Sequence, residues 1–190
     1  MSAPRHEEAA DWVKACVVEV RQGASAGSGL TWALDVVVTA AHVVRAGRLD
    51  VRLPDGQVRE ARVRLADRER DIAVLDVPRL GLPAVLRRDP AELRPGEVLF
   101  AIGHPLGVRH AMSAGILHAV GPLPEGYPGP PRLQRLPWLQ ADLRLAPGNS
   151  GGPIADTLGR VVGVSTMTVG GLALAVPITA VEALVRARAA

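Results

Sequence analysis

Short runs of aliphatic and β-branched residues, separated by glycine and proline, recur along nearly the whole 190-residue chain. The 20 glycines and 16 prolines interrupt helices and favour turns. Apolar residues make up 48% of the sequence but aromatic residues only 3%, so the core must be aliphatic. This pattern predicts an all-β protein of about a dozen short strands, in one domain or in two small lobes that share a core.

The strands are expected where apolar runs lie between turn residues. They are predicted at residues 13–21, 30–33, 36–38, 49–53, 58–65, 72–77, 98–102, 111–120, 138–141, 154, 161–165 and 172–176. Turns or loops are predicted at residues 22–29, 54–56, 121–137 and 166–172, with a connection between two halves at 87–96. Residues 1–11 are expected to be a loose arm or a short helix, and residues 178–190 have the spacing of a C-terminal helix after Pro177.

Several classes of protein are disfavoured by what the sequence lacks. Cys16 is the only cysteine, so the chain has no internal disulfide, and we expect this thiol to be buried in its apolar run. No basic segment followed by an apolar one stands at the start, and no apolar run reaches membrane-spanning length. We therefore expect a cytoplasmic protein that does not contact the membrane.

Arginine supplies nearly all of the positive charge, and residues 59–71 are its densest stretch. Such a run is compatible with an anionic partner such as nucleic acid. Acidic residues are interleaved with the arginines, and aromatic groups that would stack on bases are missing nearby. We therefore interpret the stretch as a solvated strand face and turn, and we expect no nucleic-acid partner.

The segment Pro-Gly-Asn-Ser-Gly-Gly-Pro at residues 147–153 is the strongest chemical motif. Its glycines allow the backbone to approach a substrate carbonyl closely, and successive N–H groups can converge there on a developing negative charge. Ser150, at its centre, is then a candidate nucleophile. The alternative is a plain glycine-rich turn in which Ser150 is only a turn former.

A serine hydroxyl needs a base, which is most often histidine. His42 follows a buried-strand pattern that ends in small residues, and it is the leading candidate. His104, in a glycine- and proline-flanked segment, is the main rival, and we interpret it as a loop residue. No two histidines stand with acids at a metal-ligand spacing, so we expect neither a metal nor a cofactor.

The base also needs an acid that orients it. Asp71 opens a strongly apolar strand, an unusual place for a carboxylate without a partner. Asp76 and Asp35 are alternatives, although both suit turns or exposed strand ends. The order His42, Asp71, Ser150 is that of the chymotrypsin type and differs from the subtilisin and α/β-hydrolase orders.

The sequence resembles the bacterial trypsin-like peptidases, and among them the protease domain of the HtrA (Do/Deg) group. The matching segments are residues 27–29, 38–44, 71–75, 101–107, 140–142, 147–153, 161–164 and 175–178. Together they place the resemblance over roughly residues 13–185.

The resemblance implies two six-stranded antiparallel barrels, at about residues 13–86 and 97–178, after an arm of residues 1–12 and before a helix of residues 179–190. It implies a serine endopeptidase that works through an acyl-enzyme, with His42 as base and Asp71 as its orienting acid. The oxyanion hole would be formed by backbone N–H groups in the segment Gly148, Asn149 and Ser150. Protein or peptide substrates are the implied partners.

The chain also departs from the pattern of the HtrA group. We expect no PDZ domain after its last helix, and Ala146 stands where the group usually has a polar residue. Regulation by a separately encoded partner is therefore a further expectation. A second reading stays open, a catalytically silent scaffold that binds peptides or a partner protein, because a complete triad does not guarantee a formed oxyanion hole.

The sequence gives little indication of which residues form the pocket for P1, the substrate residue before the cleaved bond. Leu145, Met167 and Ala173 are the candidates, and no acid accompanies them. We expect a small or medium aliphatic P1 residue, with Arg144 as a candidate for an acidic preference that can equally point to solvent.

Overall fold

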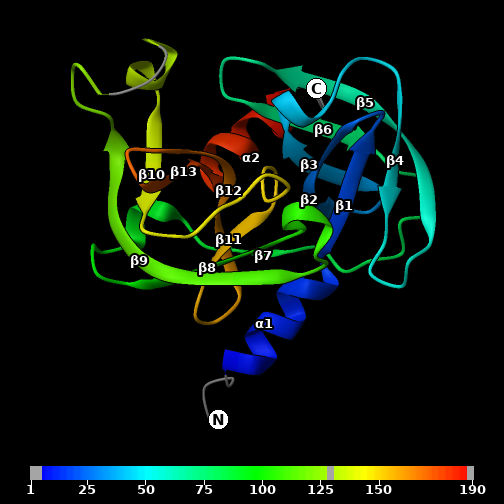
Figure 1. Cartoon of the computed structure of the whole chain (residues 1–190), viewed down its shortest axis with the longest axis horizontal. Helices are drawn as coiled ribbons and strands as arrows, with labels where there is room; N and C mark the ends of the chain where they lie inside the picture. Colours follow the sequence, from blue (N-terminus) through cyan, green and yellow to red (C-terminus); the bar gives the residue numbers. More distant parts are fainter. Residues whose placement is uncertain (1–5, 128–130, 188–190) are drawn as a thin grey trace.

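A computed structural model describes residues 6–127 and 131–187, and it contains two six-stranded antiparallel barrels. The first consists of β1 (Val17–Gln22), β2 (Ser25–Ala33), β3 (Val36–Ala40), β4 (Arg48–Arg52), β5 (Val58–Asp67) and β6 (Ile72–Asp76). The second consists of β8 (Val98–Gly103), β9 (Ala111–Pro122), β10 (Pro137–Ala141), β11 (Pro153–Asp156), β12 (Arg160–Val169) and β13 (Leu172–Pro177). The predicted all-β class with two such barrels is confirmed, and Figure 1 shows them side by side.

The first barrel closes in the order β1-β2-β3-β6-β5-β4. In the second barrel the order is β11-β8-β9-β10-β13-β12, and the pairing of β12 with β11 completes the circuit. A short strand in the connection, β7 (Leu86–Arg87), adds to β12 in parallel. Closed barrels leave few unpaired strand edges, so the loops at the barrel ends can be held by a rigid frame.

The largest apolar cluster lies between the barrels and ties them together. It contains Leu30, Val38 and Ile72 from the first barrel with Ile102 and Trp138 from the second, all 1% exposed or less. A separate aliphatic cluster fills each barrel. Each Å² of apolar surface that is buried stabilises the folded chain by about 25 cal/mol, so a shared core of this kind joins the two barrels firmly. Loops from the two barrels therefore meet in a defined geometry.

Helices stand at both ends of the described chain. The C-terminal helix, α2 (Ile178–Ala187), agrees with the predicted short helix, and residues 188–190 lie outside the described residues. At the other end α1 (His6–Ala15) extends into the range predicted as the first strand. The prediction was wrong there because Ala9, Ala10 and Val13, all buried, have the spacing of one helical face.

Cys16 follows α1 and is fully buried, as expected. Its Sγ–H donates to the carbonyl oxygen of Trp12 at 3.3 Å. Burial raises the pKa of this thiol to about 11, which suits a packing role.

Two predicted turns are shorter in the structure because strands extend into them. Residues 25–29 belong to β2, where Gly27 and Gly29 leave room for packing: a Cβ on Gly27 would lie 2.7 Å from Val43 Cγ2, and one on Gly29 would lie 2.8 Å from Val37 Cγ1. Residues 166–169 belong to β12, so the turn to β13 consists only of Gly170 and Gly171, with φ of +59° and +84°. The loop predicted at residues 121–137 contains the one-turn helix η4 (Pro131–Arg135), and residues 128–130 lie outside the described part.

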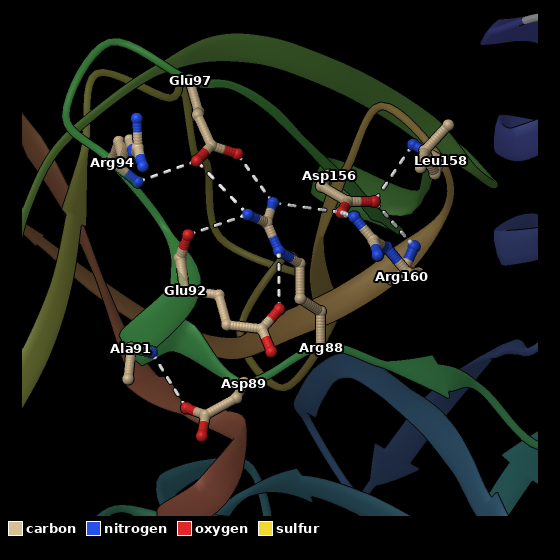
Figure 2. A network of polar contacts seen from close by, with 9 residues as sticks. All are labelled: Arg88, Asp89, Ala91, Glu92, Arg94, Glu97, Asp156, Leu158 and Arg160. Carbon is tan, nitrogen blue, oxygen red and sulfur yellow. Dashed lines mark hydrogen bonds and ion pairs between the residues drawn. The ribbon is translucent and has the colours of Figure 1, made fainter. Parts of the chain in front are cut away.

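The connection between the barrels is fixed to the second one by a charged network around Arg88 (Figure 2). The Arg88 guanidinium, 13% exposed, contacts Glu97 at 2.6 Å and Asp156 at 3.3 Å. Its Nη2 also donates to the Glu92 carbonyl oxygen at 2.9 Å. Asp156, 4% exposed, additionally binds Arg160 at 2.6 Å. The hydrogen bond between Arg88 and Glu97 raises the pKa of the guanidinium and lowers the pKa of the carboxyl, so this ion pair is charged at neutral pH.

Candidate active site

His42 and Asp71 come together at one end of the first barrel. His42 lies in the short helix η1 (Ala41–Val43) directly after β3, and Asp71 immediately precedes β6. Asp71 Oδ2 lies 2.7 Å from His42 Nδ1, and Asp71 Oδ1 accepts from the His42 backbone N–H at 2.9 Å. Because an ionised carboxylate only accepts, the ring proton lies on Nδ1, and Nε2 keeps a free lone pair.

The surroundings of this pair differ on its two sides. Asp71 is 4% exposed, and its backbone carbonyl accepts from the Ala41 N–H at 3.1 Å. Its φ of +58° is one that aspartate tolerates better than most residues. The His42 side chain is 50% exposed. The carboxylate is therefore fixed and shielded, while the imidazole can reach a molecule outside.

The alternative acids and the alternative base are used elsewhere. Asp76 Oδ1 accepts from Arg64 Nε at 2.9 Å, and Asp35 Oδ1 accepts from the Leu80 N–H at 2.9 Å. His104 lies behind the loop that precedes Ser150, with its Nδ1 3.2 Å from the Ser28 hydroxyl.

Ser150 and His42 line the same hollow, which has a volume of about 460 Å³. The Ser150 hydroxyl donates to the carbonyl oxygen of Thr166 at 3.0 Å. Its backbone carbonyl accepts from the Ser28 N–H in β2 at 2.8 Å. The serine of the second barrel is thus held against the first barrel, and its one hydroxyl proton is engaged with Thr166.

The three amides of the expected oxyanion segment differ in what they contact. The Asn149 N–H donates to the Ala146 carbonyl oxygen at 3.0 Å and is engaged in a turn. Within residues 6–127 and 131–187, the N–H groups of Gly148 and Ser150 have no protein acceptor. Gly148 and Ser150 therefore offer two free N–H donors beside the hydroxyl. The Asn149 N–H, which was expected to contribute to the oxyanion hole, is not free to do so in this geometry.

The candidate pocket residues are only partly brought to the hollow. Leu145 and Met167 line it, with Thr166 and Thr168 from β12. Ala173 is fully buried in the core of the second barrel instead, because the extension of β12 pairs it with Thr168. Arg144 is exposed and lies outside the lining.

Ser25, Ala26 and Val43 also line the hollow, although they were not predicted to. They lie in β2 and η1, and no pattern marks them in the sequence. No group of three or more potential metal ligands gathers in the part of the chain that the structure describes. None of the helices described there is both long and apolar enough to cross a membrane.

Comparison with known proteins places this arrangement in a family. A family model described as "Trypsin-like peptidase domain" matches residues 27–164. A putative serine protease HhoB from Synechocystis is 39% identical over 157 residues, which is 80% of this chain and 37% of that protein. A probable periplasmic DegP-like serine endoprotease from Ectopseudomonas mendocina is 39% identical over 77% of this chain and 30% of its own length. The chain spans about a third of the length of these curated relatives.

Solved structures agree with this assignment. The HtrA-type protease AlgW with a tripeptide superimposes with a TM-score of 0.85 at 28% identity, over 96% of this chain and 63% of that one. The periplasmic names among the relatives give no support to the cytoplasmic location expected from the sequence. The fold, the family model and these similarities show that the chain belongs to the family of trypsin-like peptidase domains and is similar to its HtrA-type members.

Proposed function

We propose that the chain is a serine endopeptidase in which Ser150 is the nucleophile, His42 the base and Asp71 the acid that orients the base. The principal support is the buried Asp71 carboxylate, which holds His42 by two hydrogen bonds at the edge of the hollow that contains Ser150. Family membership makes peptide hydrolysis the natural reaction for this arrangement.

The proposed reaction begins with a rotation of the Ser150 hydroxyl away from Thr166 toward His42 Nε2. As Nε2 takes the proton, the oxygen attacks the substrate carbonyl carbon, and the N–H groups of Gly148 and Ser150 stabilise the oxyanion. The imidazolium, stabilised by Asp71, then gives its proton to the leaving amine. Water, activated by His42, hydrolyses the remaining ester and regenerates the serine.

Substrate preference rests on the side chains around the hollow. Leu145 and Met167 offer apolar contact, and Thr166 and Thr168 add a polar edge. Among the described residues, no acidic or basic side chain other than His42 lines the hollow. We therefore propose a small or medium aliphatic P1 residue. Peptide ligands are named for the AlgW structures, which supports an extended peptide as the partner.

A silent peptide-binding scaffold is the second candidate, and one observation favours it. The Ser150 hydroxyl bonds to Thr166 and not to His42. The bond between nucleophile and base is often loose before substrate binds, which favours the enzyme. Regulation by a separately encoded partner and the cellular location stay predictions.

Digestion of fluorescently labelled casein separates the two candidates. Wild type is expected to release soluble fluorescent peptides, and Ser150→Ala none. Ser113→Ala is a matched control, because its hydroxyl lies on β9 and accepts from the Arg144 N–H at 2.9 Å. Casein binding without cleavage by wild type would favour the scaffold.

A further inference from the structure

His104 occupies a buried position directly behind the loop that carries Gly148. The side chain follows β8 and is 5% exposed. Its Nδ1 lies 3.2 Å from the Ser28 hydroxyl, and its ring centroid lies 4.9 Å from that of His110. The reaction steps proposed above do not use this buried histidine, although it lies close to the candidate oxyanion hole.

The Ser28 hydroxyl has three polar neighbours, and their chemistry fixes the direction of each hydrogen bond. It lies 2.7 Å from the carbonyl oxygen of Gly148, which can only accept. The backbone N–H of His104 donates to it at 2.9 Å. A hydroxyl has one proton and two acceptor sites, so the third neighbour, His104 Nδ1, must donate as well. His104 is therefore the Nδ1–H tautomer.

The charge state of the ring agrees with this assignment. Burial lowers the pKa of His104 to about 4, and positive charge at His110 and Arg109 adds to the effect. At neutral pH the ring is neutral and carries one proton. The Ser28 hydroxyl determines that this proton lies on Nδ1.

The loop is held on both sides of Gly148 by this region. The Gly148 carbonyl accepts from Ser28, and the carbonyl of Pro147 accepts from the Leu106 N–H at 2.9 Å. Because a trans peptide is planar, fixing the Pro147 carbonyl directs the Gly148 N–H to the opposite side, away from Leu106. A Cβ at Gly148 would meet the His104 carbonyl oxygen at 2.3 Å, so the fit is tight.

We propose that His104 is a positioning residue for hydrolysis: its Nδ1–H holds the Ser28 hydroxyl on the Gly148 carbonyl, which fixes the peptide after Gly148. Together with the bond from Leu106 to the Pro147 carbonyl, this holds the loop that presents the Gly148 N–H to the oxyanion. This inference rests on the function proposed above. Loss of the Nδ1–H leaves an acceptor site of Ser28 buried and unpaired, and it removes one of the two donors that hold the Ser28 oxygen beside the Gly148 carbonyl. This loss is expected to raise the free energy of the transition state, in which the oxyanion forms, and to leave the affinity for substrate nearly unchanged.

The test compares rates of covalent labelling by a fluorophosphonate probe and the steady-state constants of peptide cleavage. His104→Leu and Ser28→Ala are expected to lower the labelling rate and kcat by about 10- to 100-fold, with KM changed by less than about threefold. His104→Asn, whose amide can donate to Ser28, is expected to restore most of the rate. The matched control is His118→Leu, because His118 is exposed on β9.

Each outcome decides the matter. Normal labelling and kcat in both His104→Leu and Ser28→Ala would overturn the inference alone. An equal loss in His104→Asn and His104→Leu would also overturn it, because the donor would then be irrelevant. If His104→Leu does not fold, the pair Ser28→Ala and His104→Asn still decides, with a loss expected only in the first. Absence of labelling in wild type would overturn the proposed function itself.

Discussion

His42 Nδ1 lies 2.7 Å from Asp71 Oδ2, and the other oxygen of the same carboxylate accepts from the His42 backbone N–H at 2.9 Å. This two-point contact fixes both the position of the imidazole and the nitrogen that carries its proton. It explains how a ring that is half exposed can keep a defined lone pair on Nε2.

Asp71→Asn should test that relationship. An amide can donate to Nδ1, which would favour the tautomer that has its proton on Nε2 and cannot act as a base. We expect kcat on a peptide substrate to fall about 1,000- to 10,000-fold, with the melting temperature nearly unchanged. Asp50→Asn, at an exposed position of β4, should be indistinguishable from wild type. A similar kcat for Asp71→Asn and wild type would exclude Asp71 from the mechanism.

Gly148→Ala should damage the oxyanion loop. Gly148 has φ of +104°, and the new Cβ would meet the His104 carbonyl oxygen. Gly47 has φ of +108°, and nothing lies within 4 Å of the position that a Cβ would take there, so Gly47→Ala reports backbone strain alone. We expect Gly47→Ala to lose about 1 kcal/mol of stability and Gly148→Ala to lose more, because of the clash with His104. Only Gly148→Ala should also lose at least about 100-fold in kcat. Equal activity of the two variants would contradict the assigned role of the Gly148 N–H.

The pH dependence of stability should report the buried His104. Its pKa is about 4 in the folded chain against an ordinary 6.5, so the unfolded chain binds more protons between these values. Stability is therefore expected to fall as the pH drops from 6.5 to 4, by up to about 3 kcal/mol. Urea unfolding at pH 7.5 and 4.5 measures the fall, which should be smaller by about that amount in His104→Asn. Equal falls in both proteins would show that His104 is not buried as a neutral group.

The fold was largely predictable where the pattern of apolar residues is local. Strands β3 and β6 are short apolar runs between turn residues, and both stand where they were expected. The end of α1 at Ala15 was not predicted. Val13 packs on the buried face of α1, but in the sequence it stands next to the β-branched run of β1, so the first strand was predicted to begin at Val13. The glycines of β2 looked like a turn, since only the packing of Val37 and Val43 from other elements requires them.

Candidate site residues could be predicted from the sequence where they lie in distinctive motifs. His42, Asp71 and Ser150 each stand in a distinctive segment, and the structure places His42 and Ser150 on one hollow. Ala173 was misplaced because its orientation depends on the register between β12 and β13. The bond from Ser28 to Gly148 joins residues 120 positions apart, and no local pattern encodes it.

The network around Arg88 should contribute to stability more than an exposed ion pair does. Arg88→Met removes the shared partner of Glu97 and the buried Asp156. Because Arg160 still pairs with Asp156, we expect a loss of about 1.5 to 3 kcal/mol, as for hydrogen bonds to charged groups. Arg48→Met is the matched control, because the Arg48 and Glu60 side chains are 67% and 56% exposed, and it should cost less than about 1 kcal/mol. Urea denaturation gives both values. If Arg88→Met lowers the free energy of unfolding as little as the control does, the network does not stabilise the segment that connects the two barrels.

The most direct test of Ser150 as the nucleophile is the mass of the intact chain after treatment with a fluorophosphonate, followed by mapping of the modified peptide. We predict the gain of one phosphonyl group by wild type, attached to Ser150, and no gain by Ser150→Ala. No modification of folded wild type, or modification at a residue other than Ser150, would contradict the proposed mechanism.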